Sequence, residues 1–174
     1  CGAARFSYNT LLSYVKTNLE QGAPISWSFY SLRKYFNTIK EEIAPWWREV
    51  SKESFASGAF NLAAALKNWS DSKQGKRQGE PVGFPSYKSK YRVVDSVTYT
   101  TGIIRLESTR HHVTLPRVGR IHLLESSSAL CRLIEQGEAR ITKATVKYER
   151  GRWMVSLSAR VSQSVMPQHP PPGT

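Results

Sequence analysis

The chain has 174 residues, a formal net charge of +12 and a pI near 10.0, so it can bury a sizeable core and carries a positive field. Hydrophobic residues make up 40% and charged residues 22%, a composition that excludes a wholly disordered chain. Residues 73–174 hold 17 Lys and Arg against 7 Asp and Glu, whereas residues 1–72 hold 8 against 6. Nucleic acid is therefore the favoured partner; a membrane surface is disfavoured because no basic amphipathic helix is evident.

The sequence carries no marks of a membrane or secreted protein. No apolar run reaches the length of a membrane span, and no secretory signal opens the chain. Cys1 and Cys131 lie far apart, and the four histidines lack the spacing of a zinc site. We therefore expect a reducing, cytoplasmic compartment, with no metal and no cofactor bound by this chain.

Residues 1–72 predict three amphipathic helices, because apolar residues recur there at steps of three and four. The three stripes are Tyr8, Leu12, Val15 and Leu19; Phe29, Leu32, Phe36, Ile39 and Ile43; and Phe55, Ala59, Leu62, Leu66 and Trp69. Short links between the helices predict a small three-helix bundle, with Trp46 and Trp47 closing one end. Gly58 and the alanines at 63–65 are small enough to let another helix or backbone approach closely.

Capping and breaking residues place the ends of these helices. Gly22 follows the first stripe and predicts its C-terminal stop. Ser26 or Ser28 can cap the second helix, and Pro45 ends it. Ser51 is a good N-cap for the third.

An exposed basic loop and an aromatic, cationic segment follow. Residues 70–83 are polar and rich in Gly, Lys and Arg, which predicts the loop. The next stretch is GFPSYKSKYR, Gly83–Arg92, which we call the junction motif; its Pro85 favours an extended chain. In such a chain Lys88, Lys90 and Arg92 point one way, a pattern that suits a nucleic-acid backbone, although a solvated strand entry is an equal alternative. Phe84 is expected to pack in the core.

The second half predicts about six short antiparallel strands and hence a small β-barrel or curled sheet. The expected strands are Val93–Thr100, Ile103–Glu107, His111–Leu115, the runs on either side of a turn at Val118-Gly119, and a hairpin of Ile141–Tyr148 and Trp153–Val161. Strict alternation in the last strand predicts one buried face, and Gly151 suits its turn. A short helix is expected around Leu130–Ile134. The fold class is α+β, with four segments: residues 1–72, helical; 73–92, basic loop and junction; 93–163, β-rich; and 164–174, a Pro-rich linker or tail.

The residues give little sign of catalysis. Asp71 and Asp95 are the only aspartates, and the glutamates are scattered over helix faces and turns, whereas acid–base or two-metal chemistry needs clustered carboxylates. A Cys131 nucleophile with His111 or His122 is an open alternative, but a lone cysteine is more often inert packing. No catalytic residue is assigned.

Five segments, in order, resemble the N-terminal half of TnpB-type (OrfB) transposon proteins, which are related to type V CRISPR effectors. They are ARFSYN (4–9), EVSKESFASGAFNLAAALKNW (49–69), the junction motif, LPRVGRIHL (115–123) and ITKATVKYERGRWMVSLSARV (141–161). The resemblance implies a helical recognition region inserted into a wedge-like β-barrel that holds a structured guide RNA and target DNA. It also implies a magnesium-dependent RuvC-type nuclease domain downstream and a first barrel strand upstream, so we expect the barrel here to be incomplete.

The resemblance also implies binding residues. As contacts to nucleic acid we expect Tyr87, Lys88, Lys90 and Arg92, then Arg5, Lys67, Lys76, Arg77, Arg117 and Arg120. Ala56 and Ser57 stand where the family commonly has two glutamines that can face the target-adjacent DNA motif, so DNA reading there is in doubt. Phe60, Ala63 and Ala64 replace usually charged positions.

Two other functions stay open at this point. The chain could be a freestanding RNA- or DNA-binding module with a scaffolding or regulatory role, or a small Cys/His hydrolase with an incidental basic surface. The sequence does not give the oligomeric state, the guide RNA or the target-adjacent motif.

Overall fold

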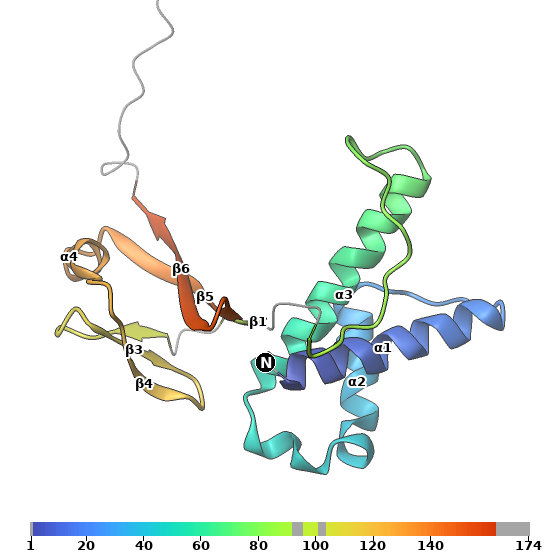
Figure 1. Ribbon diagram of the computed structural model, residues 1–174, viewed down its shortest axis with the longest axis horizontal. Helices are drawn as coiled ribbons and strands as arrows, with labels where there is room; N and C mark the ends of the chain where they lie inside the picture. Colours follow the sequence, from blue (N-terminus) through green and yellow to red (C-terminus); the bar gives the residue numbers. More distant parts are fainter. Residues whose placement is uncertain (1, 92–95, 101–103, 163–174) are drawn as a thin grey trace, which may run out of the picture. The chain divides into compact units, whose positions relative to one another are not determined.

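The computed structural model describes residues 2–91, 96–100 and 104–162 (Figure 1). The helices are α1 (Gly2–Glu20), α2 (Phe29–Ile43), a 3₁₀ helix η1 (Pro45–Glu49), α3 (Lys52–Lys73) and α4 (Ser128–Glu135). The strands are β1 (Ser96–Tyr99), β2 (Arg105–Leu106), β3 (His112–Leu115), β4 (Gly119–His122), β5 (Ala139–Glu149) and β6 (Arg152–Val161). The predicted α+β class is confirmed.

By contacts, the described residues fall into two compact units. The first holds residues 2–91, 96–98 and 146–154, and the second holds 99–100, 104–145 and 155–162. The helices α1, α2 and α3 lie in the first unit, together with the end of the β5–β6 hairpin nearest its turn. Strands β2, β3 and β4 and helix α4 lie in the second.

The apolar stripes of α1, α2 and α3 meet in one core within the first unit. Leu11, Leu12, Leu32, Leu62 and Leu66 are fully buried there. Each buried leucine side chain contributes about 1.5–3 kcal/mol relative to leaving it exposed. The predicted stripe of α1 omitted the fully buried Leu11 and extended too far: Leu19 is 39% exposed, because the last turn of α1 extends beyond the core.

The helix ends follow the predicted caps. The Ser28 hydroxyl accepts a hydrogen bond from the Ser31 backbone N–H, and Ser51 Oγ accepts one from Glu53. Gly22 follows α1 with a positive φ of 65°. However, α3 continues to Lys73, so the basic loop begins later than the predicted residue 70, because Ser70, Asp71 and Ser72 still belong to the helix.

Gly58 is the point of closest approach between α1 and α3. A Cβ atom built on it would lie 2.0 Å from Ser7 Oγ and 2.3 Å from the Ala4 carbonyl oxygen. Ser7 Oγ in turn donates hydrogen bonds to the carbonyls of Ala4 and Phe55, at 3.1 and 3.0 Å. The expected close approach at Gly58 is therefore confirmed.

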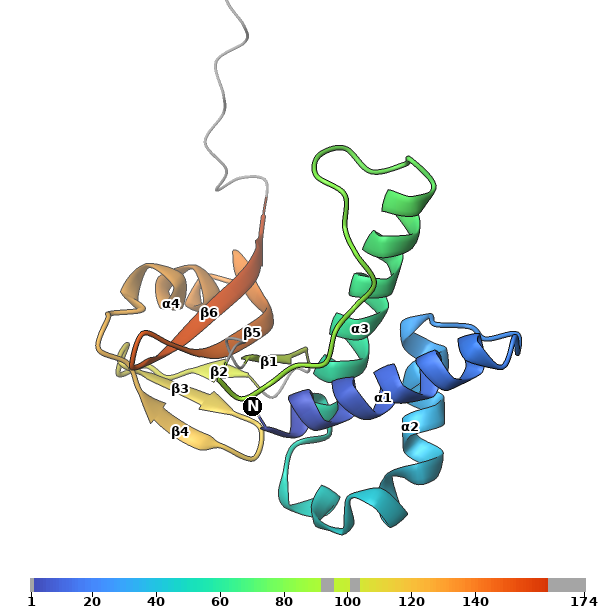
Figure 2. The same ribbon diagram turned by 45° about the vertical axis from the view of Figure 1, so that its right-hand side comes forward.

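The strands form two three-stranded sheets, ordered β1-β5-β6 and β2-β3-β4 (Figure 2). In the second sheet β3 pairs antiparallel with β2 and with β4, and Val113 lies opposite both Leu106 and Ile121. Neither sheet closes into a barrel among the described residues, which differs from the predicted barrel. Closure needs a continuous hydrogen-bonded ladder back to the first strand, and here the strands divide between two ladders.

Several details of the predicted strands need correction. The turn after β3 occupies residues 116–118, whereas it was expected at Val118-Gly119; Arg117 has φ 63°, and Gly119, with φ 81°, is already the first residue of β4. Val93 and Ile103, the predicted first residues of two strands, lie outside the described residues. In β6 the residues of the expected buried face are only half-buried or exposed. Trp153, the first residue of that face, is 64% exposed. Alternation therefore predicted the strand but overstated its burial.

Candidate nucleic-acid interface

The junction motif is fixed to α1 through the side chain of Asn9. Asn9 Nδ2 donates to the Lys88 carbonyl oxygen at 2.9 Å, and the Lys88 N–H donates to Asn9 Oδ1 at 2.8 Å. The amide thereby satisfies both backbone groups of Lys88, as a neighbouring strand would. This arrangement holds the backbone of the motif along one face of α1.

The beginning of the motif is anchored on α3. Phe84 packs edge-to-face on Trp69, with ring centroids 4.9 Å apart, and adjoins the helical core. The Val82 N–H donates to Ser72 Oγ at 2.9 Å, and Pro85 is buried. The predicted core role of Phe84 is confirmed, and in both views the segment after α3 runs back beside that helix toward α1 (Figures 1 and 2).

Tyr87 and Lys88 each contact α1 through their side chains. The Tyr87 hydroxyl lies 3.1 Å from Ser13 Oγ, and Lys16 Nζ lies 4.6 Å from the centroid of the Tyr87 ring. Lys88 Nζ lies 4.2 Å from the Tyr8 ring centroid. Tyr87 is still 51% exposed, so one aromatic surface and two ammonium groups gather on this side of α1.

The extended conformation of the motif ends before Lys90. Residues 90 and 91 form a turn, Lys90 is exposed, and Tyr91 is 90% exposed, with Lys90 Nζ 5.8 Å from its ring centroid. The alternate-residue argument therefore fails at Lys90, because a turn changes the direction of successive side chains. Arg92 lies outside the described residues.

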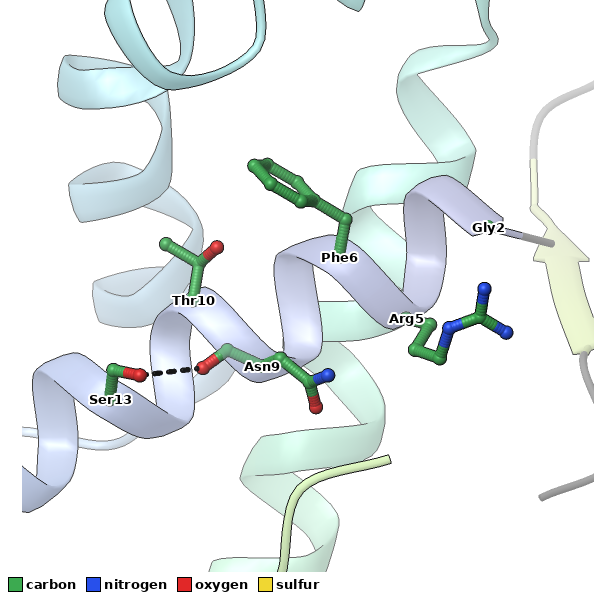
Figure 3. A pocket seen from close by; sticks show the side chains of 6 residues that line it. All are labelled: Gly2, Arg5, Phe6, Asn9, Thr10 and Ser13. Atoms are coloured by element: carbon green, nitrogen blue, oxygen red, sulfur yellow. Dashed lines mark hydrogen bonds between the residues drawn. The ribbon is translucent and has the colours of Figure 1, made fainter. Parts of the chain in front are cut away.

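An open groove of about 440 Å³ runs along α1 beside these contacts (Figure 3). Arg5 and Gly2 lie toward one end and Ser13 toward the other, where Ser13 Oγ donates to the Asn9 carbonyl oxygen at 3.2 Å. The groove is lined by Gly2, Arg5, Phe6, Asn9, Thr10 and Ser13, of which none is acidic. Hydroxyl, amide and guanidinium donors on an open surface can bind phosphate and sugar oxygens.

Tyr8 lies at the inner edge of the interface. Its side chain is 4% exposed, and this burial raises the pKa of the phenol above its ordinary value of 10.0, because burial disfavours the charged tyrosinate. Tyr8 therefore stays neutral at physiological pH and offers the Lys88 ammonium an uncharged π-face.

Two of the three basic residues predicted near the end of α3, Lys67 and Arg77, have local partners for their side chains. Lys67 forms an ion pair with Asp71 one turn along α3, and its side chain is 73% exposed. Arg77 Nη1 donates to the Glu80 carbonyl oxygen at 3.2 Å, and Lys76 is exposed in the loop. Their predicted contacts with nucleic acid stay predictions.

Arg117 and Arg120 belong to the second unit. Arg117 is exposed in the β3–β4 turn, whereas Arg120 Nε donates to Glu107 Oε2 at 2.8 Å. The pKa of the neighbouring His112 is lowered, first by desolvation and then by the Arg120 guanidinium, which disfavours a second positive charge. Arg120 thus has an acidic partner within its own sheet.

Ala56 and Ser57 face the interior of the first unit to different extents. Ser57 is 6% exposed, and its Oγ accepts a hydrogen bond from the Thr98 N–H at 3.2 Å. Ala56 is half-buried and lines a small cavity of about 40 Å³ with Lys52 and Trp47. A role in reading DNA at these positions stays a prediction.

Cys131, the alternative nucleophile, is 4% exposed; its thiol lies 3.7 Å from the Glu107 carbonyl oxygen and 3.4 Å from Ser127 Oγ. The rings of His111 and His122 stack on each other, with their centroids 6.2 Å apart.

In the described part of the chain no three His, Cys, Asp or Glu side chains form a group able to hold a metal ion. The described helices also include none that is long and apolar enough to cross a membrane.

Three interface residues were missed from the sequence: Asn9, Ser13 and Lys16. They lie at steps of four and three on α1, the polar counterpart of its apolar stripe. That spacing could have grouped them on one face. It could not have shown that Tyr87 and Lys88 would lie against that face.

Two known proteins, from two strains of Mycobacterium tuberculosis, are similar to this chain. They are named "Putative RNA-guided DNA endonuclease MT2953" and "Putative RNA-guided DNA endonuclease Rv2885c", and each is 34% identical over 93% of this chain. The chain is a relative of part of these proteins. It spans only 38% of the length of each, and no family model matches it. The similarity agrees with the resemblance seen in the motifs, whereas the finer assignment to the TnpB group stays a prediction.

Proposed function

We propose that this chain is a nucleic-acid-binding region of an RNA-guided DNA endonuclease, and that it holds a structured guide RNA and the target DNA. The relatives carry the name of such a nuclease, and the chain corresponds to about two fifths of their length. We place the nuclease chemistry and its magnesium ions outside this region, because the described carboxylates are scattered or already paired with Lys or Arg.

The observation that carries the proposal is the attachment of the junction motif to α1. Two hydrogen bonds from Asn9 fix the backbone of Lys88, and Tyr87 and Lys88 bring an aromatic ring and a cation to the same helix face. Prepositioned groups lose less conformational entropy on binding than free surface lysines do. A basic, aromatic surface held in place is suited to the phosphates and bases of RNA.

The proposal is tested by the double variant Lys88→Ala with Lys90→Ala in a filter-binding titration at two or more salt concentrations. The probes are a structured RNA, a DNA duplex and a single strand. We expect wild type to prefer structured RNA, and the variant to bind it about tenfold more weakly, with a salt slope lower by roughly one to two. The matched control is Lys34→Ala with Lys143→Ala, which removes the same charge from two exposed lysines on α2 and β5.

Two results would contradict the proposal. Equal losses in both double variants would show that only net charge matters. Weak binding to all three probes that disappears with salt would show a generic positive field and no dedicated interface.

A further inference from the structure

The turn of the β5–β6 hairpin carries an exposed pair of aromatic rings that the interface on α1 does not use. Tyr148 is the second-last residue of β5 and Trp153 the second residue of β6, and their ring centroids lie 5.0 Å apart at 50°. They are 46% and 64% exposed, and the neighbouring Met154 is 47% exposed. Two exposed aromatic rings in contact with each other on one short segment form a candidate binding surface.

The turn itself holds the two rings at a fixed spacing. Only Arg150 and Gly151 separate the strands, and both have positive φ, 52° and 75°. This is the backbone of a tight two-residue hairpin turn, which places the flanking positions 149 with 152 and 148 with 153 opposite each other. Tyr148 and Trp153 are therefore a cross-strand pair on one face, so neither ring needs to be ordered on binding.

The charges around this pair favour a polyanion. Lys147 pairs with Glu149 at 2.7 Å and contributes no net charge. Arg150 and Arg152 are exposed, and in the described part of the chain neither takes part in an ion pair. Two guanidinium groups beside two exposed rings match the phosphate and the base of one nucleic-acid strand.

We propose that the tip of this hairpin is a stacking platform for an unpaired base of a single-stranded nucleic-acid segment. An open ring face on Trp153 or Tyr148 stacks on the base, and Arg150 and Arg152 bind the adjacent phosphates. A base inside a duplex is already stacked on its neighbours, so the platform selects unpaired nucleotides such as those in RNA loops and ends. The inference deepens the proposed function by adding a second contact, but its observations are independent of the junction motif.

The test compares a short oligouridylate with an abasic strand of equal length and charge, by fluorescence anisotropy with the whole chain. Wild type is expected to bind the base-bearing strand more tightly. The double variant Tyr148→Ala with Trp153→Ala is expected to lose about tenfold in affinity for that strand and to bind the abasic strand unchanged. Trp153→Phe keeps a ring and is expected to keep most of the preference.

The control is Tyr30→Ala, which removes another strongly exposed ring, 79% exposed on α2. The proposal would be overturned if the double variant still bound the base-bearing strand more tightly than the abasic strand. It would also be overturned if wild type showed no such preference. The outcome is separate from the test of Lys88 and Lys90, whose measure is the salt slope for structured RNA. The variant Tyr148→Ala with Trp153→Ala can lose the base preference while Lys88→Ala with Lys90→Ala binds structured RNA like its control. That result would support the stacking platform and contradict the interface on α1.

Discussion

The side-chain amide of Asn9 is bound at both of its polar atoms by the backbone of Lys88, 79 residues away. One oxygen and one nitrogen are needed, at 2.8 and 2.9 Å, and only an Asn or Gln offers both. The backbone of Lys88 is thus held on α1 by a single side chain.

Replacing Asn9 by alanine should release the motif. Both backbone groups of Lys88 lose their partner, at a cost of about 1–3 kcal/mol. We expect faster hydrogen exchange at the Lys88 amide and weaker binding of structured RNA, measured by NMR and filter binding. Asn37→Ala, which removes an exposed amide of α2, is the control. Unchanged exchange at Lys88 would show that the motif is held by its other contacts.

Gly58→Ala should destabilise the helical unit by several kcal/mol, because the new methyl group overlaps the Ala4 carbonyl oxygen and cannot be accommodated by a side-chain rotation. The measurement is the urea midpoint of unfolding. Gly83→Ala is the control, since no atom lies within 4 Å of its added Cβ. Equal midpoints for the two variants would contradict the close approach of α1 and α3.

The stability of the chain should fall at high pH through Tyr8. Burial raises its folded pKa above the unfolded value near 10.0, so the folded state keeps the phenol proton after the unfolded state has lost it. This contribution is complete below pH 10 and is lost as the pH rises toward the raised folded pKa. Urea unfolding between pH 9 and 11 should therefore show a smaller loss for Tyr8→Phe than for wild type. Parallel curves would refute the assignment.

Asp71→Asn tests whether Lys67 contacts nucleic acid. The exposed pair contributes little to folding, about 0.3–0.5 kcal/mol, so stability should hardly change. Freed from its partner, Lys67 should tighten RNA binding and raise the salt slope by roughly one. Glu41→Gln makes the same change in net charge on α2. If both variants gain the same RNA affinity, only the net charge has acted and Lys67 does not contact the RNA.

The sequence by itself determined the three amphipathic helices, their caps at Ser28 and Ser51, the close approach at Gly58 and the tight hairpin around Gly151. Each of these follows from spacing along the chain or from the backbone freedom of one residue, and both are local properties. The resemblance to RNA-guided nucleases could likewise be read from motifs in order.

Only the tertiary structure decided where these pieces meet. The contact between Asn9 and Lys88, the packing of Phe84 on Trp69 and the division of the strands between two sheets join residues far apart in the chain. Such pairings depend on how whole elements pack, and many pairings satisfy the same local pattern. The exposure of Trp153 is the clearest case: alternation predicted its face, but only its neighbours in space could decide whether that face is covered.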